Sequence, residues 1–294
     1  MQKKRSRLLM ILISLCLTVL SVGRASAQNP PEWTAPFPPF KIAGNLYYVG
    51  GKDLASYLVT TPQGNILINS NLEETVPQIR ASVEKLGFKF SDIKILLISH
   101  AHRDHDAGSN RIKTLTGAKY EVMDEDVSVV ESGGKTDFAY GNDPTTPKYA
   151  PTHVDRVLHD GDVVKLGGTE LVAHLTPGHT KGCTTWTMKV TEGGKTYNVV
   201  IVGSTGINPG YNLVDSKVYP QMAADYEKTF RVLKSLPTDI FLGAHGGYFD
   251  LEAKYPRYQK VGFTAFVDPV GYQQFVKERE LGFREELAKQ RAGR

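Results

Sequence analysis

The chain has 294 residues, of which 40% are hydrophobic and 22% are charged, with 35 Lys and Arg against 31 Asp and Glu. Five of the basic residues and none of the acidic ones lie in residues 1–27, so residues 28–294 carry a net charge of about −1. This balance excludes a general attraction to nucleic acids or to anionic surfaces, and we expect no nucleic-acid partner.

The N-terminus has the features of a secretory signal peptide. Basic residues precede an apolar run at 8–22, and the small residues Ala25 and Ala27 stand at the positions that determine cleavage. We expect cleavage after Ala27, export to the periplasm or the medium, and no membrane association of the mature chain. A membrane anchor is the alternative. After cleavage Cys183 is the remaining cysteine, so no internal disulfide can form.

Residues 28–294 are expected to form a single domain, because no linker or low-complexity stretch divides them. Short β-rich segments separated by turn signals are predicted at 46–49, 55–60 and 66–68. A helix is predicted next, because apolar residues recur at helical spacing and stop at a glycine: Val76, Ile79, Val83, Leu86 and Gly87. The apolar run at 93–98 predicts a buried strand.

The second half repeats this organisation. Its predicted elements are strands at 163–166, 170–174, 184–190, 197–202 and 240–242 and a helix at about 221–235. Asp268 and Pro269 are typical of a helix start. We expect a C-terminal helix with its apolar residues facing inward: Tyr272, Phe275, Val276, Phe283 and Leu287. Strands before and after each helix predict an α/β fold of two mixed β-sheets with helices on the outer faces, a four-layer sandwich.

The residues after the strand at 93–98 carry the strongest functional signal. His100, His102, Asp104 and His105 fall within six positions, a density of metal ligands that folding alone does not require. In an extended segment, residues two apart point the same way, so His100 and His102 can bind one ion. A turn would then direct Asp104 and His105 toward a neighbouring ion. One segment can therefore serve two metals.

Two further histidines follow predicted strands in glycine-bearing turns, His179 and His245. Loops at strand ends are where open α/β folds keep their sites. His153, His159 and His174 lack such a setting and are interpreted as ordinary histidines. Imidazole with a single carboxylate suits zinc better than calcium or magnesium, and three histidines plus water form an open, catalytic arrangement. We therefore predict two zinc ions per chain and hydrolysis of a carbonyl or phosphoryl compound.

The His-x-His-x-Asp-His segment, the later Gly-His-Thr and the final histidine resemble the metallo-β-lactamase superfamily over essentially all of residues 28–294. The resemblance implies the metallo-β-lactamase fold, an αββα sandwich. It also implies two sets of zinc ligands: His100, His102 and His179 for the first ion, and Asp104, His105 and His245 for the second.

The segment 200–206 distinguishes the branches of this superfamily. The lactonases, glyoxalase II-like thioesterases and nucleases of the superfamily usually carry a Gly-Asp there, whose carboxylate bridges both metals. This chain has Gly203 and Ser204 instead. Asp215, eleven residues further on, is a poor substitute. A site without that bridge resembles the true β-lactamases. The Asp-His end of the first motif, with no cysteine ligand at 203–205, resembles their subclass B3.

This resemblance implies zinc-dependent hydrolysis of the β-lactam ring amide of β-lactam antibiotics by a metal-bound hydroxide, which would confer antibiotic resistance. Asp104 is the candidate catalytic residue, which orients the hydroxide. The candidates for substrate binding are Ser204, Thr205 and Tyr211, for which a turn-stabilising or packing role is equally open. The expected partner is a small-molecule β-lactam, and we expect a monomer.

Three alternative functions stay open. A lactonase or other small-ester hydrolase of the same fold is the nearest, and the missing bridging aspartate counts against it. A di-iron redox protein usually needs more carboxylate ligands and a flavin partner. A non-catalytic metal-binding protein would be expected to have lost a ligand, and none is evidently lost.

Two features of the sequence have open roles. Arg103, which stands between two ligands, is either a solvated side chain or part of a positive rim that alters substrate preference. Residues 131–153 are rich in Gly, Asp, Pro and Thr without apolar periodicity, and we expect a mobile loop over the cleft.

Overall fold

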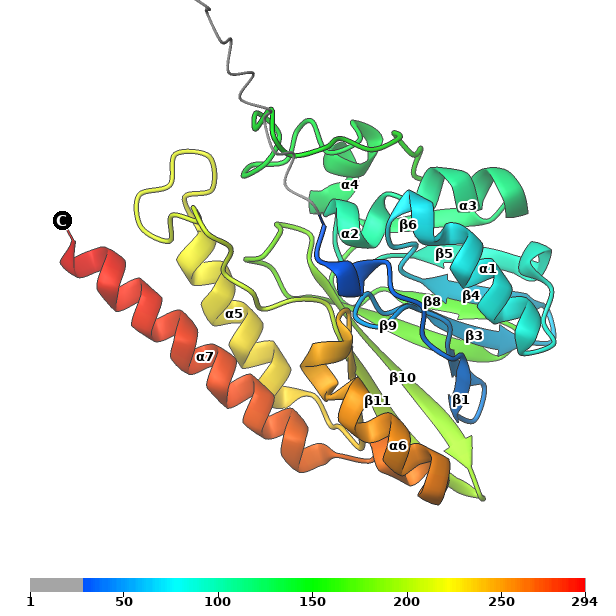
Figure 1. The fold of residues 1–294 in the computed structure, drawn as a ribbon. Coiled ribbons are helices and arrows are strands. Elements are labelled where there is room, and N and C mark those ends of the chain that lie inside the picture. Colours follow the sequence, from blue (N-terminus) through cyan, green and yellow to red (C-terminus); the bar gives the residue numbers. More distant parts are fainter. Residues whose placement is uncertain (1–28, 294) are drawn as a thin grey trace, which may run out of the picture.

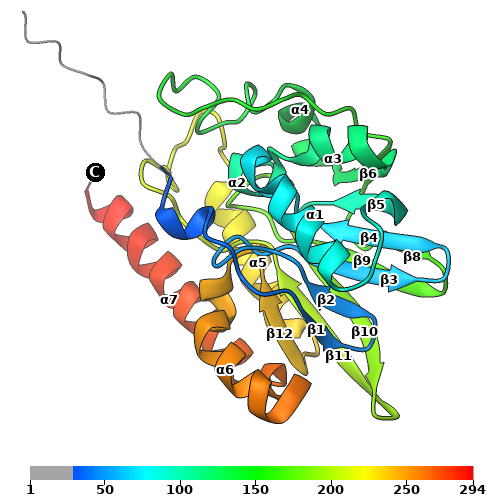
Figure 2. The ribbon, with the colours of Figure 1, turned by 45° about the vertical axis from the view of Figure 1, so that its right-hand side comes forward.

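The computed structural model describes residues 29–293 (Figure 1). The expected signal peptide, residues 1–27, lies outside the described residues. Two β-sheets lie face to face, and helices cover the outer face of each (Figures 1 and 2). The predicted α/β sandwich of two mixed sheets is therefore confirmed.

The first sheet contains seven strands, which lie side by side in chain order. They are β1 (Phe40–Ala43), β2 (Leu46–Tyr48), β3 (Tyr57–Thr61), β4 (Gly64–Ile68), β5 (Ile93–Leu97), β6 (Lys119–Met123) and β7 (Arg156–Leu158). Neighbours from β1 to β4 pair antiparallel, and neighbours from β4 to β7 pair parallel. The carboxyl ends of β4, β5 and β6 therefore meet at one edge, where β3 begins.

The second sheet contains five strands in the order β12, β11, β10, β9 and β8. Their bounds are β8 (Val163–Leu166), β9 (Thr169–Leu175), β10 (Thr184–Glu192), β11 (Lys195–Val202) and β12 (Ile240–Gly243). Strands β8 to β11 pair antiparallel, and β12 runs parallel to β11. Because β9, β11 and β12 run in one direction, they end at the same edge of this sheet.

The helices divide between the two outer faces. Their bounds are α1 (Val76–Lys85), α2 (Arg103–Asp106), α3 (Ser109–Thr116), α4 (Asp124–Glu131), α5 (Met222–Ser235), α6 (Leu251–Val261) and α7 (Pro269–Ala292). Short 3-10 helices lie at Pro31–Trp33, Glu73–Thr75, Phe90–Asp92, Gly246–Phe249 and Gly262–Phe266. Helices α1, α3 and α4 cover the first sheet, and α5 and α7 lie side by side over the second (Figures 1 and 2).

Alternation along the strands divides the apolar side chains between two cores. On β3, Leu58 packs toward the helices that cover the first sheet, whereas Tyr57 and Val59 belong to the core between the sheets. On β4, Leu67 follows the first pattern and Ile66 the second. A side-chain period of two on a sheet that is buried on both faces produces this division.

The C-terminal helix was predicted most completely. Asp268 caps α7 by accepting a hydrogen bond from the backbone N of Gly271. The five residues predicted to face inward are its buried residues: Tyr272, Phe275, Val276, Phe283 and Leu287. None of the helices in residues 29–293 combines the length and the apolar character that crossing a membrane requires.

Several short elements were not predicted: β1, β6, β7, α2, α3, α4 and α6. In α3, Ile112 is the single buried apolar residue of eight, so the segment shows no helical periodicity. Between α4 and β7 the chain forms turns without a regular helix or strand. This segment covers one side of the site described below, as predicted for 131–153; its mobility stays a prediction.

Candidate metal centre

The edge at which strands of both sheets end carries all six predicted ligands. Strand β5 ends at Leu97, the chain bends at Ser99 and Ala101, and His102 has an extended backbone with φ −74° and ψ 151°. Helix α2 then begins at Arg103 and turns the next ligands away. The loops after β9 and β12 bring His179 and His245 to the same place. The turn that begins at Arg103 agrees with the prediction, whereas the segment that carries His100 and His102 is bent and not continuously extended.

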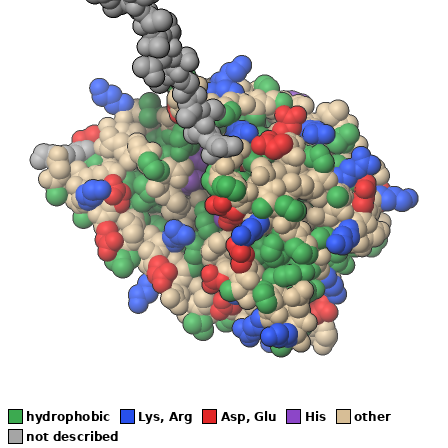
Figure 3. Space-filling view, in the orientation of Figure 1, with side chains coloured by type: hydrophobic (Ala, Val, Ile, Leu, Met, Phe, Trp, Pro, Cys, Tyr) green, Lys and Arg blue, Asp and Glu red, His purple; other side chains and the backbone are tan. Residues whose placement is uncertain are grey.

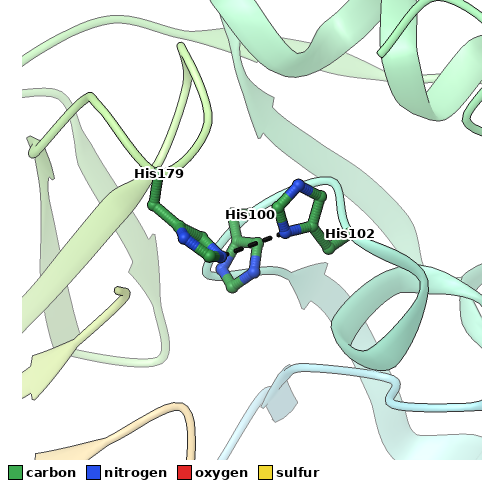
Figure 4. A group of neighbouring side chains, drawn as sticks. All are labelled: His100, His102 and His179. Atoms are coloured by element: carbon green, nitrogen blue, oxygen red, sulfur yellow. Dashed lines mark hydrogen bonds between the residues drawn. The ribbon is translucent and has the colours of Figure 1, made fainter. Parts of the chain in front are cut away.

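Three buried histidines form the first group. His100, His102 and His179 offer ligand atoms that lie within 4.8 Å of one another, from three different directions (Figure 4). The Nδ1 atom of His102 lies 3.0 Å from the Nε2 atom of His179. The Nε2 atom of His100 is buried without a hydrogen-bond partner among the described residues. A buried nitrogen without a partner is costly in a protein core, and a metal ion would satisfy it.

Burial keeps these three imidazoles uncharged. It lowers the pKa of His100 well below its ordinary value, that of His102 to about 4 and that of His179 to about 3. The neighbouring histidines reinforce this effect on each of them, because a second positive charge in the same pocket is unfavourable. At neutral pH the group therefore presents neutral nitrogens, the form that binds metal.

Asp104, His105 and His245 form a second group beside the first. The Nε2 atom of His105 lies 3.1 Å from both the Nε2 atom of His245 and the Oδ2 atom of Asp104. The remaining edge of this triangle, from His245 Nε2 to Asp104 Oδ2, is 3.5 Å. Tetrahedral zinc with bonds of about 2.0–2.2 Å holds its ligand atoms about 3.3–3.6 Å apart. One edge, at 3.5 Å, lies within this range, and the two edges of 3.1 Å are slightly shorter, so the donor set fits zinc in chemistry and comes close to it in spacing.

Outer partners fix the orientation of two of the rings. His179 shares a hydrogen bond of 2.8 Å between its Nδ1 atom and the carbonyl oxygen of Gly206, which leaves Nε2 free of a proton. His245 Nδ1 lies 2.8 Å from Asp53 Oδ2, on the loop before β3. Carboxylate and carbonyl partners of this kind orient metal-binding histidines. The role of Asp53 was not predicted, because the contact joins residues 192 positions apart.

The carboxylate of Asp104 is charged in this setting. Burial raises its pKa, but His105 and His245 outweigh that effect and hold the pKa well below the usual value. Burial likewise lowers the pKa of His245, whereas Tyr248, Asp104 and Asp53 raise it well above the ordinary value. The carboxylates of Asp104 and Asp53 therefore favour a positive charge at the second group, which a proton on His245 supplies in the absence of metal and a bound cation would supply in its place.

A cavity of about 520 Å³ opens over both groups. Its walls are largely apolar and aromatic and come from the N-terminal segment, the segment between α4 and β7, and the loops after β11 and β12: Trp33, Tyr140, Pro147, Tyr149, Asn208, Pro209 and Tyr248. Histidine side chains are visible within a hollow of the surface in Figure 3. The volume is within the range of pockets that bind small molecules.

The three residues predicted to bind substrate lie behind this wall. The Ser204 hydroxyl lies 3.1 Å from the hydroxyl of Tyr248, which does line the cavity. The Tyr211 hydroxyl donates to the backbone carbonyl of His179 at 2.7 Å, so Tyr211 supports a ligand loop. Thr205 is buried and its hydroxyl has no partner among the described residues. Direct contact of these three side chains with a substrate stays a prediction.

Arg103 does not point at the metal ligands. Its guanidinium donates to Asn29 at 3.0 Å and lies 3.5 Å from the carboxylate of Glu74, so it holds the N-terminal segment at the cavity rim. The three histidines interpreted as ordinary lie elsewhere and have other partners: His153 with Glu131, His159 with Asp162 and Asp124, and His174 with Thr187.

The sequence and the fold are similar to those of known metallo-hydrolases. A family model described as the metallo-beta-lactamase superfamily matches residues 50–245. Among curated proteins, a probable metallo-hydrolase of Burkholderia pseudomallei (strain 1710b) is 30% identical over 166 residues, which are 54% of this chain and 53% of the relative. The chain thus spans about half the length of this curated relative.

Solved structures match more of the chain. The native FEZ-1 metallo-beta-lactamase from Legionella gormanii is 61% identical, with a TM-score of 0.86 over 88% of this chain and 98% of that chain. The class B3 di-zinc metallo-beta-lactamase LRA-12 from an Alaskan soil metagenome is 35% identical, with a TM-score of 0.81 over 88% and 97% of the two chains.

Proposed function

The chain belongs to the metallo-β-lactamase superfamily, and we propose that it is a zinc-dependent hydrolase that opens the ring amide of β-lactam antibiotics. The identity of 61% to a metallo-β-lactamase over nearly the whole of that chain supports this substrate class above the others of the superfamily. We further propose that it is an enzyme of subclass B3 that confers antibiotic resistance. Antibiotics would reach such an enzyme outside the cytoplasm, which agrees with the export expected from residues 1–27.

The observation that carries the proposal is the pair of ligand groups at the floor of one cavity. The first group contains three neutral histidines, and the second contains a carboxylate and two histidines. By the resemblance described above, Ser204 occupies the position at which lactonases and thioesterases of the superfamily usually carry a bridging carboxylate. Its hydroxyl bonds to Tyr248 and to the backbone N of Gly206.

When bound in this site, zinc supplies a water of lowered pKa and a Lewis acid that polarises the amide carbonyl. The chain's own residues position the reaction. His100, His102 and His179 would hold the first ion, and the charged carboxylate of Asp104 would orient the attacking water. In the overall reaction water adds to the carbonyl carbon, the ring C–N bond breaks and the nitrogen gains a proton. The aromatic walls would shield one side of a bound ring from bulk water.

We propose a second zinc ion, held by Asp104, His105 and His245. The triangle formed by their ligand atoms supports it. Replacing His245 with Ala should then lower the zinc content from about two ions to about one per chain, because it removes one donor of the second group and none of the first. Elemental analysis of the dialysed protein measures this. A zinc content equal to that of the unmodified protein would remove His245 from the ligands.

The proposed reaction is tested by mass analysis of a penicillin before and after treatment with zinc-loaded protein. Hydrolysis of the ring amide adds one water, about 18 Da, to the substrate and leaves the protein mass unchanged, because the proposed mechanism needs no acyl-enzyme. A persistent covalent adduct on the protein would contradict the mechanism. A penicillin that stays intact would contradict the function.

A further inference from the structure

A carboxylate that contacts none of the six predicted ligands lies beneath the first group. Asp126 is in the first turn of α4, and 1% of its surface is exposed. Burying a carboxylate this completely is unfavourable unless hydrogen bonds compensate for the lost water. The donors that do so come from two segments, each of which carries ligands of the first group.

The two oxygens of Asp126 accept three hydrogen bonds. Oδ2 accepts from the backbone N of Ala101, which lies between His100 and His102, at 2.9 Å. The same oxygen accepts from the hydroxyl of Thr180, the residue after His179, at 2.9 Å. Oδ1 accepts from the backbone N of Gly182 at 2.9 Å. One side chain therefore joins the segment after β5 to the loop after β9.

The close approach of this loop depends on a glycine. A Cβ atom at position 182 would lie 2.6 Å from the backbone N of Asp126 and 2.7 Å from its Cγ atom. A side chain there would force the loop or the start of α4 to shift. A hydrogen bond from the backbone N of Thr184 to the carbonyl of Ser99, at 2.7 Å, joins the same two segments further from the ligand atoms.

We propose that Asp126 is a positioning residue that sets the geometry of the first metal site by holding its two ligand-bearing segments on one carboxylate. His102 Nδ1 and His179 Nε2 lie 3.0 Å apart although the two residues are 77 positions apart in the sequence. The carboxylate of Asp126 bonds to the residue next to each of them, Ala101 and Thr180. Asp126 bonds to residues next to the ligands and does not line the cavity. It affects the reaction through the affinity of the site for its ion, and this inference rests on the proposed metal site.

The test measures zinc affinity by competition with a chromogenic chelator, in a His245→Ala background in which the first group alone is complete. Asp126→Asn keeps the shape of the side chain but directs an NH₂ group at an N–H or O–H donor. We expect zinc affinity to fall about 10–100-fold, the usual effect of losing an outer partner of a metal site. The absorption spectrum of the cobalt-loaded protein should also change, because the angles between the ligands change.

Two further variants keep the result interpretable. Thr180→Val removes one donor and leaves the carboxylate, so it should lower zinc affinity by a smaller factor, and it carries the test if Asp126→Asn does not fold. Asp239→Asn is the matched control, because Asp239 also accepts two hydrogen bonds, from the backbone and side chain of Asn198, away from both ligand groups. It should leave zinc affinity and the cobalt spectrum unchanged.

Unchanged zinc affinity and cobalt spectrum in Asp126→Asn would overturn the proposal, as would unchanged affinity in Thr180→Val if Asp126→Asn does not fold. An equal loss in Asp239→Asn would also overturn it, because the effect would then be one of general stability. A protein that binds no zinc with Asp126 intact would instead contradict the proposed metal site.

Discussion

Removal of zinc should lower kcat/KM for a chromogenic cephalosporin by at least about a thousandfold. Bound zinc lowers the pKa of a water from 15.7 to about 7 and contributes several kcal/mol through Lewis acidity, and each 1.36 kcal/mol corresponds to a factor of ten in rate. The carboxylates that line the cavity, Asp104 and Asp137, do not replace these contributions, because a carboxylate is not a Lewis acid and Asp104 is held in its charged form. The measurement is the initial rate after dialysis against a chelator.

Addition of zinc to the dialysed protein is the control for this experiment. The ligand groups are held by strands and helices whose own hydrogen bonds do not involve the metal. Activity should therefore return when zinc is added, without refolding of the protein. Calcium should not restore it, because the donors are mainly imidazole nitrogens, which calcium binds poorly. Full activity in thoroughly zinc-free protein would contradict the mechanism.

Replacing Asp104 with Asn should lower kcat by roughly 10²–10⁴, the range expected when a group that accepts a proton or directs a water is lost. The carboxylate oxygen lies 3.1 Å from His105 and 3.5 Å from His245, and its low pKa keeps it charged at assay pH. An amide keeps the size of the side chain and removes the charge. The measurements are kcat and zinc content of the same preparation.

The control for this variant is Asp124→Asn, the same chemical change at an exposed carboxylate at the start of α4. It should leave kcat and zinc content unchanged. If Asp104→Asn retained full kcat with its zinc content intact, Asp104 would have no catalytic role. If the first zinc were lost as well, the division of the six ligands between two sites would be wrong.

The parts of the site that are local in sequence could be predicted. His100 and His102 precede helix α2 and Asp104 and His105 lie within it, so the spacing of the four residues alone indicated two directions of binding. His179 and His245 were identified because each follows a strand in a glycine-bearing turn. The apolar strands and α7 could also be predicted, because the periodicity of their apolar residues reflects which face is buried.

Contacts between distant segments could not be predicted. Asp53 and Asp126 stand in segments with no motif, and their partners are fixed only when both sheets and α4 are in place. The wall of the cavity could not be predicted for the same reason, because its aromatic residues Trp33, Tyr140 and Tyr248 come from three distant parts of the chain. Tyr211 was predicted to bind substrate, but its hydroxyl donates a hydrogen bond to the backbone carbonyl of His179.

Lactonases and other small-ester hydrolases share this fold, so the choice of substrate is the most direct test of the proposed β-lactam hydrolysis. The measurement is kcat/KM of one zinc-loaded preparation for a chromogenic cephalosporin and, in parallel, for a small lactone, each with and without a chelator. We predict chelator-sensitive hydrolysis of the cephalosporin with little or no opening of the lactone. Opening of the lactone while the cephalosporin stays intact would contradict the proposed function and favour a lactonase.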